Sequence, residues 1–530
     1  MLKKLFSILL VSLFIISLIP LSSLAADTAP KSDVSAPGGS VSTVEELVAA
    51  LGGSGIVYEN GVITLIKDVT LASSVRITSG TYTVMGSGAI IKGAFDGDVF
   101  VLSGEETTLI LGDRTAGEDD TDLTFDGENT VRGGSFFKVE KGAKLELRNS
   151  VKIENAISKT SGAAVYNEGE FTMYGGKIEN CRAEKTGGAV YNAGSIFLTS
   201  GSIKNCSANQ GGAVYSEGES TFAGTELSGC KATNGGAVYN TGNMQYRSSA
   251  ITECSADKGG AVYNSGKASV NGGTISNNKA ENGEGGGVYN VSDLELSGSV
   301  IRENYAKNGG NVYNCGNAST GDGFAAVSGN ASEKGGNVYN SELGIFTQNS
   351  GSVNLGRAVY GGGVYNLGTY NLNAGGIYAN KAEVADGLLN HGKLVLSNKG
   401  YCEKGDDIFV VLSEENTHAV TVAKNWSYST NPVSVSCGVY ENGKYSYSHS
   451  SGDKILDLKD EINVSERFLL HVPKTGLIIS DNGALAKAPA AVSKTLVTVI
   501  SIILAYPLVT AAMVYVIRLF DKKKHQAELK

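Results

Sequence analysis

Proline is scarce in this chain, and several regular patterns are missing from it. Only 7 of the 530 residues are proline, whereas 70 are glycine. The glycines do not recur at every third position, which excludes a collagen triple helix. The middle of the chain also lacks apolar residues at helical spacing, which argues against a helical repeat protein. The formal net charge of −9 offers no basic face for phosphates, so we expect no nucleic-acid partner.

The N-terminal segment has the pattern of an export signal. Lys3 and Lys4 precede an apolar run over residues 5–21, and small residues suited to cleavage follow at Ala25 and Ala26. We therefore predict a signal peptide over residues 1–26, with a linker over 27–41. The protein is expected to be exported.

A second apolar segment lies near the other end of the chain. Residues 495–517 are long enough to cross a bilayer as a transmembrane helix, after a linker over 488–494. Basic residues follow at once, which predicts a cytoplasmic tail over 518–530 and a type I topology with the ectodomain outside. Val472 to Gly476 resembles a sortase sorting signal, but 18 residues separate it from the apolar segment. We expect a strand and turn there, with cell-wall sorting as the alternative.

A six-residue motif recurs along the middle of the chain. It reads Gly-Gly-Ala-Val-Tyr-Asn at residues 187–192, and its tyrosine returns every 24 to 26 residues. The motif tyrosines are Tyr166, Tyr191, Tyr215, Tyr239, Tyr263, Tyr289, Tyr313, Tyr339 and Tyr365. A period this constant over nine copies indicates a solenoid.

A second column runs in register with the motif. In most laps an aliphatic residue precedes a small residue by three positions, as Ile178 precedes Cys181 and Val327 precedes Asn330. The small residues are Cys181, Cys206, Cys230, Cys254, Asn278, Asn304, Asn330 and Asn380. We expect them to form a structural ladder at one corner of each lap.

These periods predict an all-β fold, a right-handed parallel β-helix. About 24 residues with three short strands make one small triangular coil, and stacked coils about 4.8 Å apart share one continuous core. Alternation within the motif puts Val and Tyr on opposite faces of a strand. We expect the valines inside and the tyrosines exposed, because the aliphatic column also needs a core. The reverse assignment remains open.

The motif resembles the repeat of polymorphic outer-membrane proteins from bacterial surfaces, which is built on Gly-Gly-Ala-Ile and Phe-x-x-Asn. It is also similar to the wider pectate-lyase-like β-helix superfamily. The resemblance covers roughly residues 160–400, with Val for the first Ile and Ile for Phe. It implies an adhesin. Members of that family end in an outer-membrane barrel, whereas a terminal membrane helix favours a single-membrane envelope.

The segments that flank the repeats have the character of caps. Ser42-Thr43-Val44-Glu45 is a capping box that predicts a helix over residues 44–51, which would cover the first coil. We therefore divide the ectodomain into a capping helix with irregular coils (42–150), regular repeats (151–400) and a β-rich C-terminal cap (401–487).

The cysteines allow two interpretations. In an exported protein the stacked column of four could be bridged, but parallel side chains and the later Asn residues favour a ladder of small side chains. Cys402 and Cys437 are the more plausible disulfide, and Cys315 lies in a turn. Zinc-type spacing of Cys and His is absent, so we expect no metal and no cofactor. The acidic run at residues 118–122, with Asp126 nearby, and Asp406-Asp407 could bind calcium but are predicted to be solvated loops.

We therefore expect a non-enzymatic cell-surface protein, an adhesin or surface scaffold. Its partners would be the membrane and, through the exposed tyrosine ladder, glycans or proteins. The alternative is a membrane-anchored polysaccharide lyase or glycoside hydrolase of the pectate-lyase-like superfamily. The paired aspartates, Gly-His-Gly and Arg-x-Lys of polygalacturonase-like hydrolases are absent, and His391 is predicted to be a turn residue. We assign no catalytic residue.

Overall fold

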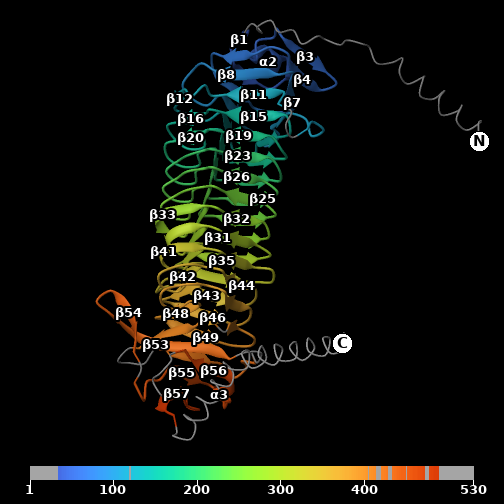
Figure 1. Cartoon of the computed structure of the whole chain (residues 1–530). Coiled ribbons are helices and arrows are strands. Elements are labelled where there is room, and N and C mark those ends of the chain that lie inside the picture. The colour runs from blue at the N-terminus through green and yellow to red at the C-terminus, as the bar shows by residue number, and fades with distance from the viewer. Residues whose placement is uncertain are drawn as a thin grey trace, which may run out of the picture.

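A computed structural model shows an elongated rod, with the first and last described strands at opposite ends (Figure 1). It describes residues 34–117, 121–403, 405–412, 419–427, 432–448, 450–471 and 477–488. The predicted signal peptide, the segment at 472–476, the membrane segment and the tail lie outside these residues, as do Glu118, Asp119 and Asp120. Within the described residues, no helix is long and apolar enough to cross a membrane.

The rod is a parallel β-solenoid with three strands in each lap. One lap contains β17 (Val165–Asn167), β18 (Glu170–Met173) and β19 (Lys177–Glu179). Each strand pairs in parallel with its equivalent in the next lap, so Val165, Tyr166 and Asn167 align with the same residue types at 190–192. The predicted all-β solenoid of three-stranded laps is thereby confirmed.

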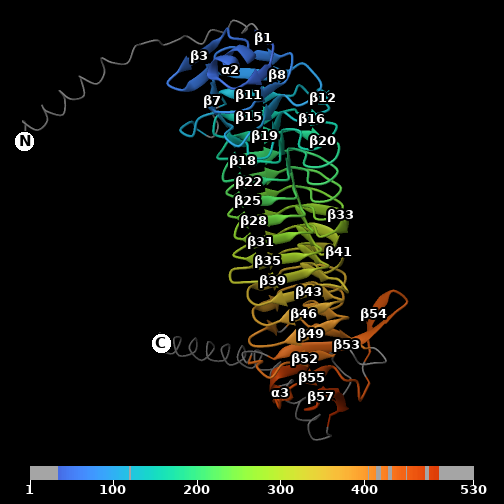
Figure 2. The ribbon, with the colours of Figure 1, turned by 180° about the vertical axis from the view of Figure 1, so that it is seen from behind.

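Three long sheets run the length of the rod, as Figures 1 and 2 show from opposite sides. We call them the motif sheet, which contains β17, the middle sheet, which contains β18, and the aliphatic sheet, which contains β19. The aliphatic sheet has 15 strands, from β1 (Val34–Ala36) to β50 (Tyr401–Cys402). Every motif valine is buried inside the coil, as predicted. Their methyl groups join the aliphatic column and the middle sheet in one continuous core.

The two glycines of the motif are each required for a different physical reason. Gly187 has φ of +60°, a conformation that disfavours every residue with a Cβ. Gly188 has no room for a Cβ because the carbonyl oxygen of Gly212 in the next lap lies against it. The same two restrictions return at the motif glycines of later laps, so the repeat keeps both.

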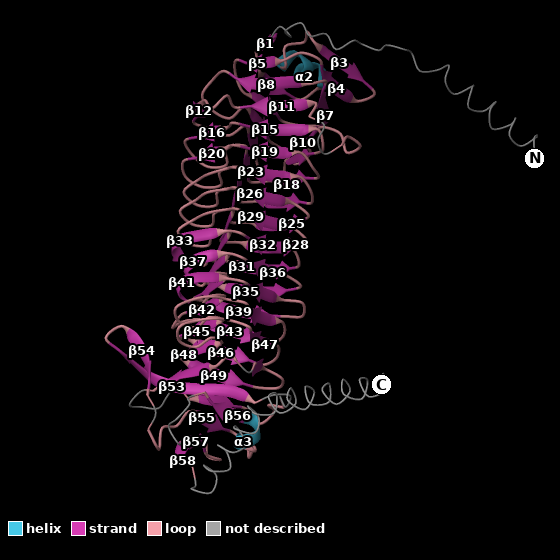
Figure 3. Ribbon diagram, viewed as in Figure 1, coloured by secondary structure: helices cyan, strands magenta, loops and turns pink. Residues whose placement is uncertain are grey.

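A fourth side was not predicted. Between the aliphatic and motif sheets each lap extends an arm, and arms of successive laps pair with one another. They form the short sheets β12 (Val131–Arg132), β16 (Ile157–Ser158) and β20 (Arg182–Ala183), and β33 (Lys279–Glu284), β37 (Tyr305–Asn308) and β41 (Asn330–Lys334). Isolated bridges such as Thr186–Gln210 connect the laps between them. The arms are the looped edge of the rod in Figure 3.

Caps cover both ends of the solenoid. The predicted N-terminal helix is α2 (Val44–Ala50), and its buried Leu47 packs into the core. The capping box lies one residue later than predicted, because Thr43 bonds the backbone of Glu46 and the Glu46 carboxylate returns to Thr43. The C-terminal cap contains α3 (Val464–Arg467) and the pair β57 (Leu477–Ile479) and β58 (Leu485–Lys487).

The ladder predicted at the aliphatic corner contains one wrong member. Ile301 pairs with Ala326, not with Val327, and Asn330 is an exposed residue of β41. The turn is one residue longer than in the preceding lap, since 14 positions separate Val312 from Ala326 against 13 between Val288 and Ile301, and the pattern Val327-x-x-Asn330 lies one residue beyond the inward Ala326. A shift of one residue moves a side chain to the other face of a strand.

Two other asparagines occupy the gap in that ladder. Gly329 stands where Asn330 was predicted, and Asn337 fills the space from the motif side, with its Oδ1 2.9 Å from the Gly329 nitrogen. A Cβ on Gly329 would lie only 2.7 Å from that oxygen. Asn311 likewise donates to Asn337 at 2.7 Å and accepts from Asn304 at 2.9 Å. The polar groups at this corner of the core, around Gly329, therefore remain paired although the side chain comes from a different strand.

The sixth residue of the motif forms a second buried column that sequence reasoning missed. Its Nδ2 donates to the Oδ1 of the next lap at 2.7–2.8 Å in most steps, as from Asn264 to Asn290 and from Asn290 to Asn314. The same Nδ2 also donates to backbone carbonyls at the turn. The signal was present in the sequence, since asparagine ends almost every copy of the motif.

Candidate functional site

The motif tyrosines form one column on the outer face of the motif sheet, and we call the strip between the arms on one side and the turns after the motif asparagines on the other the tyrosine groove. Strand register places them in one outward column, which starts before the first tyrosine and continues after the last. Its members outside the tyrosines are Ser40, Arg76, Val101 and Lys138 on the N-terminal side, and Leu389 and Phe409 on the C-terminal side. The arms stand along one bank of this groove and the turns after the motif asparagines along the other.

The tyrosine rings stack on one another along the rod. Successive ring centroids are 4.5–5.7 Å apart, and the planes are within 21° of parallel. Each ring face is therefore covered by its neighbours, and the groove presents ring edges and phenolic hydroxyls. The ring faces within the column are therefore not available for stacking against a ligand.

Exposure of the tyrosines changes along the groove. Tyr166, Tyr191, Tyr215, Tyr239 and Tyr263 are half-buried. The prediction of an exposed ladder is wrong for the other four, since Tyr289, Tyr313, Tyr339 and Tyr365 are only 2–9% exposed. The groove thus has an open half, from Tyr166 to Tyr263, and a closed half, from Tyr289 to Tyr365.

The banks explain the difference between the halves. In the open half the arm bank carries Thr186, Gln210, Asn234 and Lys258, which are bridged in register. The other bank carries polar side chains, and the Tyr191 hydroxyl donates to Glu217 at 2.9 Å. Small or polar banks leave the ring edges accessible to solvent.

In the closed half apolar side chains appear at several of these positions, although the arm bank keeps the polar Glu284, Asn308 and Lys334. Val291, Cys315 and Leu367 on the turn bank, with Tyr360 and Val384 on the arm bank, pack against the tyrosines in a second hydrophobic cluster. Lysines also reach over the rings, since the Lys258 ammonium lies 5.0 Å from the centre of Tyr289. The two banks thereby close over the column.

A hairpin seals the far end of the groove. β53 (Val433–Glu441) leaves the motif sheet and turns back as β54 (Lys444–Tyr447). The hydroxyls of Tyr445 and Tyr365 are 2.5 Å apart, and Tyr445 also contacts His391 Nδ1 at 3.3 Å. The Tyr445 ring meets Tyr365 edge to face, at a centroid distance of 6.2 Å. His391, predicted as a turn residue, thus lies beside the groove.

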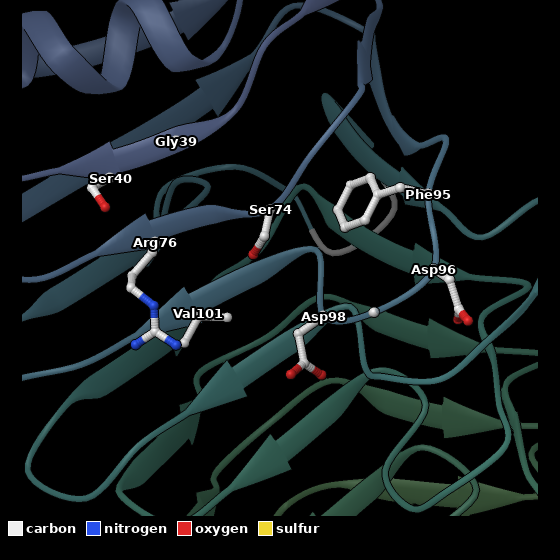
Figure 4. Close-up of a pocket in the computed structure, with 9 residues that line it drawn as sticks. Gly39, Ser40, Ser74, Arg76, Phe95, Asp96, Asp98 and Val101 are labelled. Atoms are coloured by element: carbon white, nitrogen blue, oxygen red, sulfur yellow. The ribbon is translucent and has the colours of Figure 1, made fainter.

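The N-terminal mouth of the groove is a polar hollow of about 530 Å³ (Figure 4). Arg76 and Ser40 lie on its strand side, and Ser74, Asp96 and Asp98 lie along the arm side. Arg76 forms an ion pair with Glu140 at 3.3 Å. Asp98 accepts the Ser135 amide at 2.7 Å, and Asp96 accepts the Gly133 amide. The mouth is lined by charges of both signs.

Burial also changes the ionisation of the tyrosines. It raises the pKa of Tyr191, and the hydrogen bond to Glu217 raises it further. Burial likewise raises the pKa of Tyr313 and of Tyr365. The phenols of Tyr191, Tyr313 and Tyr365 are therefore neutral at physiological pH and can donate and accept hydrogen bonds.

All seven cysteines are free thiols, so the predicted Cys402–Cys437 disulfide is not formed. The two residues lie on strands of different sheets, and the Cys437 thiol donates to the Ser448 carbonyl at 3.4 Å. In the ladder the Cys206 thiol donates to the Lys204 carbonyl at 3.3 Å. Burial raises the pKa of Cys206, which further disfavours the thiolate needed for disulfide exchange.

Three of the acidic residues considered for calcium, Asp126, Asp406 and Asp407, accept hydrogen bonds from neighbouring groups. Asp406 is buried and accepts the amides of Ala379 and Asn380 at 2.6 and 2.7 Å, which ends the ladder. The prediction of a solvated loop is therefore wrong there. Asp407 accepts the Ser436 hydroxyl at 2.6 Å and Asp126 accepts the Glu128 amide at 2.8 Å. No cluster of three His, Cys, Asp or Glu suited to a metal occurs among the described residues.

Comparison with known proteins adds no relative to this description. No family model matches the chain, and neither the curated proteins nor the solved structures include a significant match. The likeness to polymorphic outer-membrane proteins thus rests on the repeat motif, and the fold that the structure establishes is a parallel β-solenoid with three sheets.

Proposed function

We propose that this protein is a non-enzymatic cell-surface adhesin or scaffold that binds an extended glycan in the open half of the tyrosine groove. In this proposal the solenoid is a right-handed β-helix, exported by residues 1–26 and held by a membrane helix over 495–517. The observation that carries the proposal is the row of tyrosine hydroxyls from Tyr166 to Tyr263, one per lap, between polar banks.

A repeating polar polymer suits this surface better than a folded protein does. The ring stack presents hydroxyls at the spacing of the laps, about 4.8 Å, and both banks add hydrogen-bonding groups. A protein partner usually anchors itself by a large side chain in a dry pocket. The stacked floor of the open half offers hydroxyls and ring edges in place of such a pocket.

A neutral glycan is favoured over a strongly anionic one. The N-terminal part of the column carries Arg76 and Lys138, but Asp96, Asp98 and Glu140 lie around the same mouth. The chain as a whole carries a net charge of −9. A polyanion would meet repulsion from these carboxylates and from the overall charge.

The test is binding of the full chain to a glycan array, followed by removal of single hydroxyls. Tyr215→Phe keeps the stacked ring and removes one phenolic hydroxyl, so affinity should fall about fivefold, the equivalent of about 1 kcal/mol. Tyr191→Phe combined with Tyr215→Phe and Tyr239→Phe should abolish detectable binding. The matched control is Tyr339→Phe. The Tyr339 ring is buried in the closed half, so this substitution should leave the affinity for the glycan unchanged.

Equal loss from the Tyr339 and Tyr215 variants would mean that the open half is not the binding surface. Binding to matrix proteins but to no glycan would replace the proposed ligand class by a protein.

A further inference from the structure

The open half of the tyrosine groove has a regular step along the rod. The four steps between ring centroids, from Tyr166 to Tyr263, are 4.6, 5.7, 5.2 and 4.5 Å. Their average is about 5 Å, close to the ~4.8 Å between parallel strands, and an extended β-1,4-linked sugar chain advances by about the same distance per sugar. An α-1,4-linked chain curls into a helix and a β-1,3-linked chain bends. Of these three, the β-1,4-linked chain alone stays in register with five successive hydroxyls.

Two lysines mark the ends of the open half. The Lys138 ammonium lies 5.9 Å from the centre of the Tyr166 ring, and the next column residue beyond it, Val101, is buried. At the other end the Lys258 ammonium lies 5.0 Å from the centre of the Tyr289 ring, which is only 6% exposed. The strip between the two lysines therefore offers five half-buried tyrosines, one in each lap.

The turn bank of the open half carries a carboxylate in its first and third laps. The residues that follow the motif asparagines there are Glu168, Ala193, Glu217, Thr241 and Ser265. Glu168 and Glu217 are exposed, and Glu217 accepts the Tyr191 hydroxyl at 2.9 Å. Burial raises the pKa of Tyr166, and the charges of Glu168 and Glu217 raise it further, because both carboxylates lie near the same phenol.

The interval between these two carboxylates matches the symmetry of a β-1,4-linked chain. Successive sugars of such a chain are turned over relative to one another, so each side of the chain repeats every second sugar. Glu168 and Glu217 are two laps apart, and Ala193, in the lap between them, has no side-chain group to bond. A hydrogen-bond donor on one side of the chain would therefore meet both carboxylates. On the arm bank Thr186, Gln210 and Asn234 add a hydroxyl or an amide in each lap.

We propose that the ligand of the open half is an extended β-1,4-linked chain of neutral sugars, which lies along the rod with one sugar in each lap. Five sugars fill the site, and Glu168 and Glu217 accept the donors at the 2-position of the first and third sugars. The donor is a hydroxyl in a glucan and an amide N–H in a polymer of N-acetylhexosamine. This inference rests on the proposed function and specifies its ligand.

Calorimetry of the full chain with four hexasaccharides tests the linkage. Cellohexaose and chitohexaose are β-1,4-linked, maltohexaose is α-1,4-linked and laminarihexaose is β-1,3-linked. We expect one of the two β-1,4-linked chains to bind at least about tenfold more tightly than maltohexaose and laminarihexaose, and its identity shows which donor the carboxylates accept. Equal or tighter binding of maltohexaose or laminarihexaose would overturn the inference and leave the glycan function in place. Failure of all four would have the same meaning if the array reveals another glycan, whereas an array without any bound glycan would refute the proposed function itself.

A length series of the β-1,4-linked chain that binds tests the count of one sugar per lap. The affinity should rise with each sugar up to five, because each added sugar meets a further tyrosine hydroxyl. A sixth sugar should change the affinity by less than about twofold, because the column beyond Tyr263 is covered. A plateau at two or three sugars would contradict the alignment along the rod.

The two carboxylates are tested with the pentasaccharide of that chain. Glu168→Ala and Glu217→Ala should each weaken binding by about fivefold, because each removes one acceptor. The matched control is Glu219→Ala, an exposed glutamate of β25 (Glu219–Ala223) in the middle sheet, on another face of the rod, and it should leave the affinity unchanged. An unchanged affinity in both groove variants, or an equal loss in the control, would overturn the assigned contacts.

Discussion

The hydroxyl of Ser216 and the side-chain oxygen of Asn240 are neighbours in the buried motif column, and no hydrogen bond joins them. Ser216 receives the Asn192 amide at 3.0 Å and donates to the Gly218 carbonyl. Asn240 donates onward to Asn264 at 2.8 Å, but its own Oδ1 is buried without a partner. The serine side chain is shorter than that of asparagine and does not reach Asn240, so the buried Asn240 Oδ1 stays unpaired.

Ser216→Asn should therefore stabilise the protein. The new amide would donate to Asn240 as Asn264 does to Asn290, which removes an unsatisfied group and should add about 1 kcal/mol to the free energy of unfolding. Urea unfolding of the full chain measures the change. The exposed Ser332→Asn is the control and should have no effect. If the urea midpoint of Ser216→Asn does not rise, the stabilising role of the hydrogen-bonded asparagine column is contradicted.

Asn337 and Asn330 should differ sharply when each is replaced by alanine. The Asn337 side chain bonds Asn311, Gly329 and the Asn354 carbonyl inside the core, so Asn337→Ala should lower stability by about 3 kcal/mol. Asn330 has an exposed side chain, and its replacement should change stability by less than about 0.5 kcal/mol. Thermal unfolding of both variants measures the difference. Comparable losses of stability in the two variants would support the register in which Asn330 belongs to the buried ladder.

Thiol chemistry should separate Cys315 from the other six cysteines. Cys315 is half-buried in the groove bank, and the remaining thiols are buried. In the native protein we expect alkylation of Cys315 alone, and in denaturant alkylation of all seven, as counted by mass spectrometry. Peptide maps without reductant should show no link between Cys402 and Cys437. Fewer than seven reactive thiols after unfolding would reveal a disulfide.

Alkaline pH should loosen the groove. Burial raises the pKa of Tyr445 and of Tyr447 to about 12, from an ordinary value of about 10. Because the folded pKa is the higher one, their contribution to stability is complete below about pH 10 and is lost as the pH rises towards about 12. Tyrosinate absorbance and circular dichroism, followed together, should change in that window. Ionisation of every tyrosine near pH 10 with the fold intact would contradict the burial of the column.

The repeat itself made much of the fold predictable. Nine copies of Val-Tyr, eight of them followed by Asn and one by Ser216, recur at 24 to 26 residues and predicted the strand, its inward valine and the stacking of one lap on the next. Prediction failed at Asn330, because the aliphatic-x-x-Asn pattern at Val327 lies one residue beyond Ala326, which is the residue that the strand register places inward. It also failed for the closed half of the groove, because nothing local to Tyr339 reveals what packs over it.

The sequence by itself determined the period, the identity of each column and the inward face, because side chains in a parallel solenoid repeat whenever the residues do. Tertiary structure alone decided how open the groove is. Leu367, Tyr360 and Tyr445 come from a turn, an arm and a distant hairpin, and they meet over the tyrosines only once the rod is folded. Tyrosines that are equivalent in the repeat therefore differ in exposure, since burial depends on neighbours that the repeat does not encode.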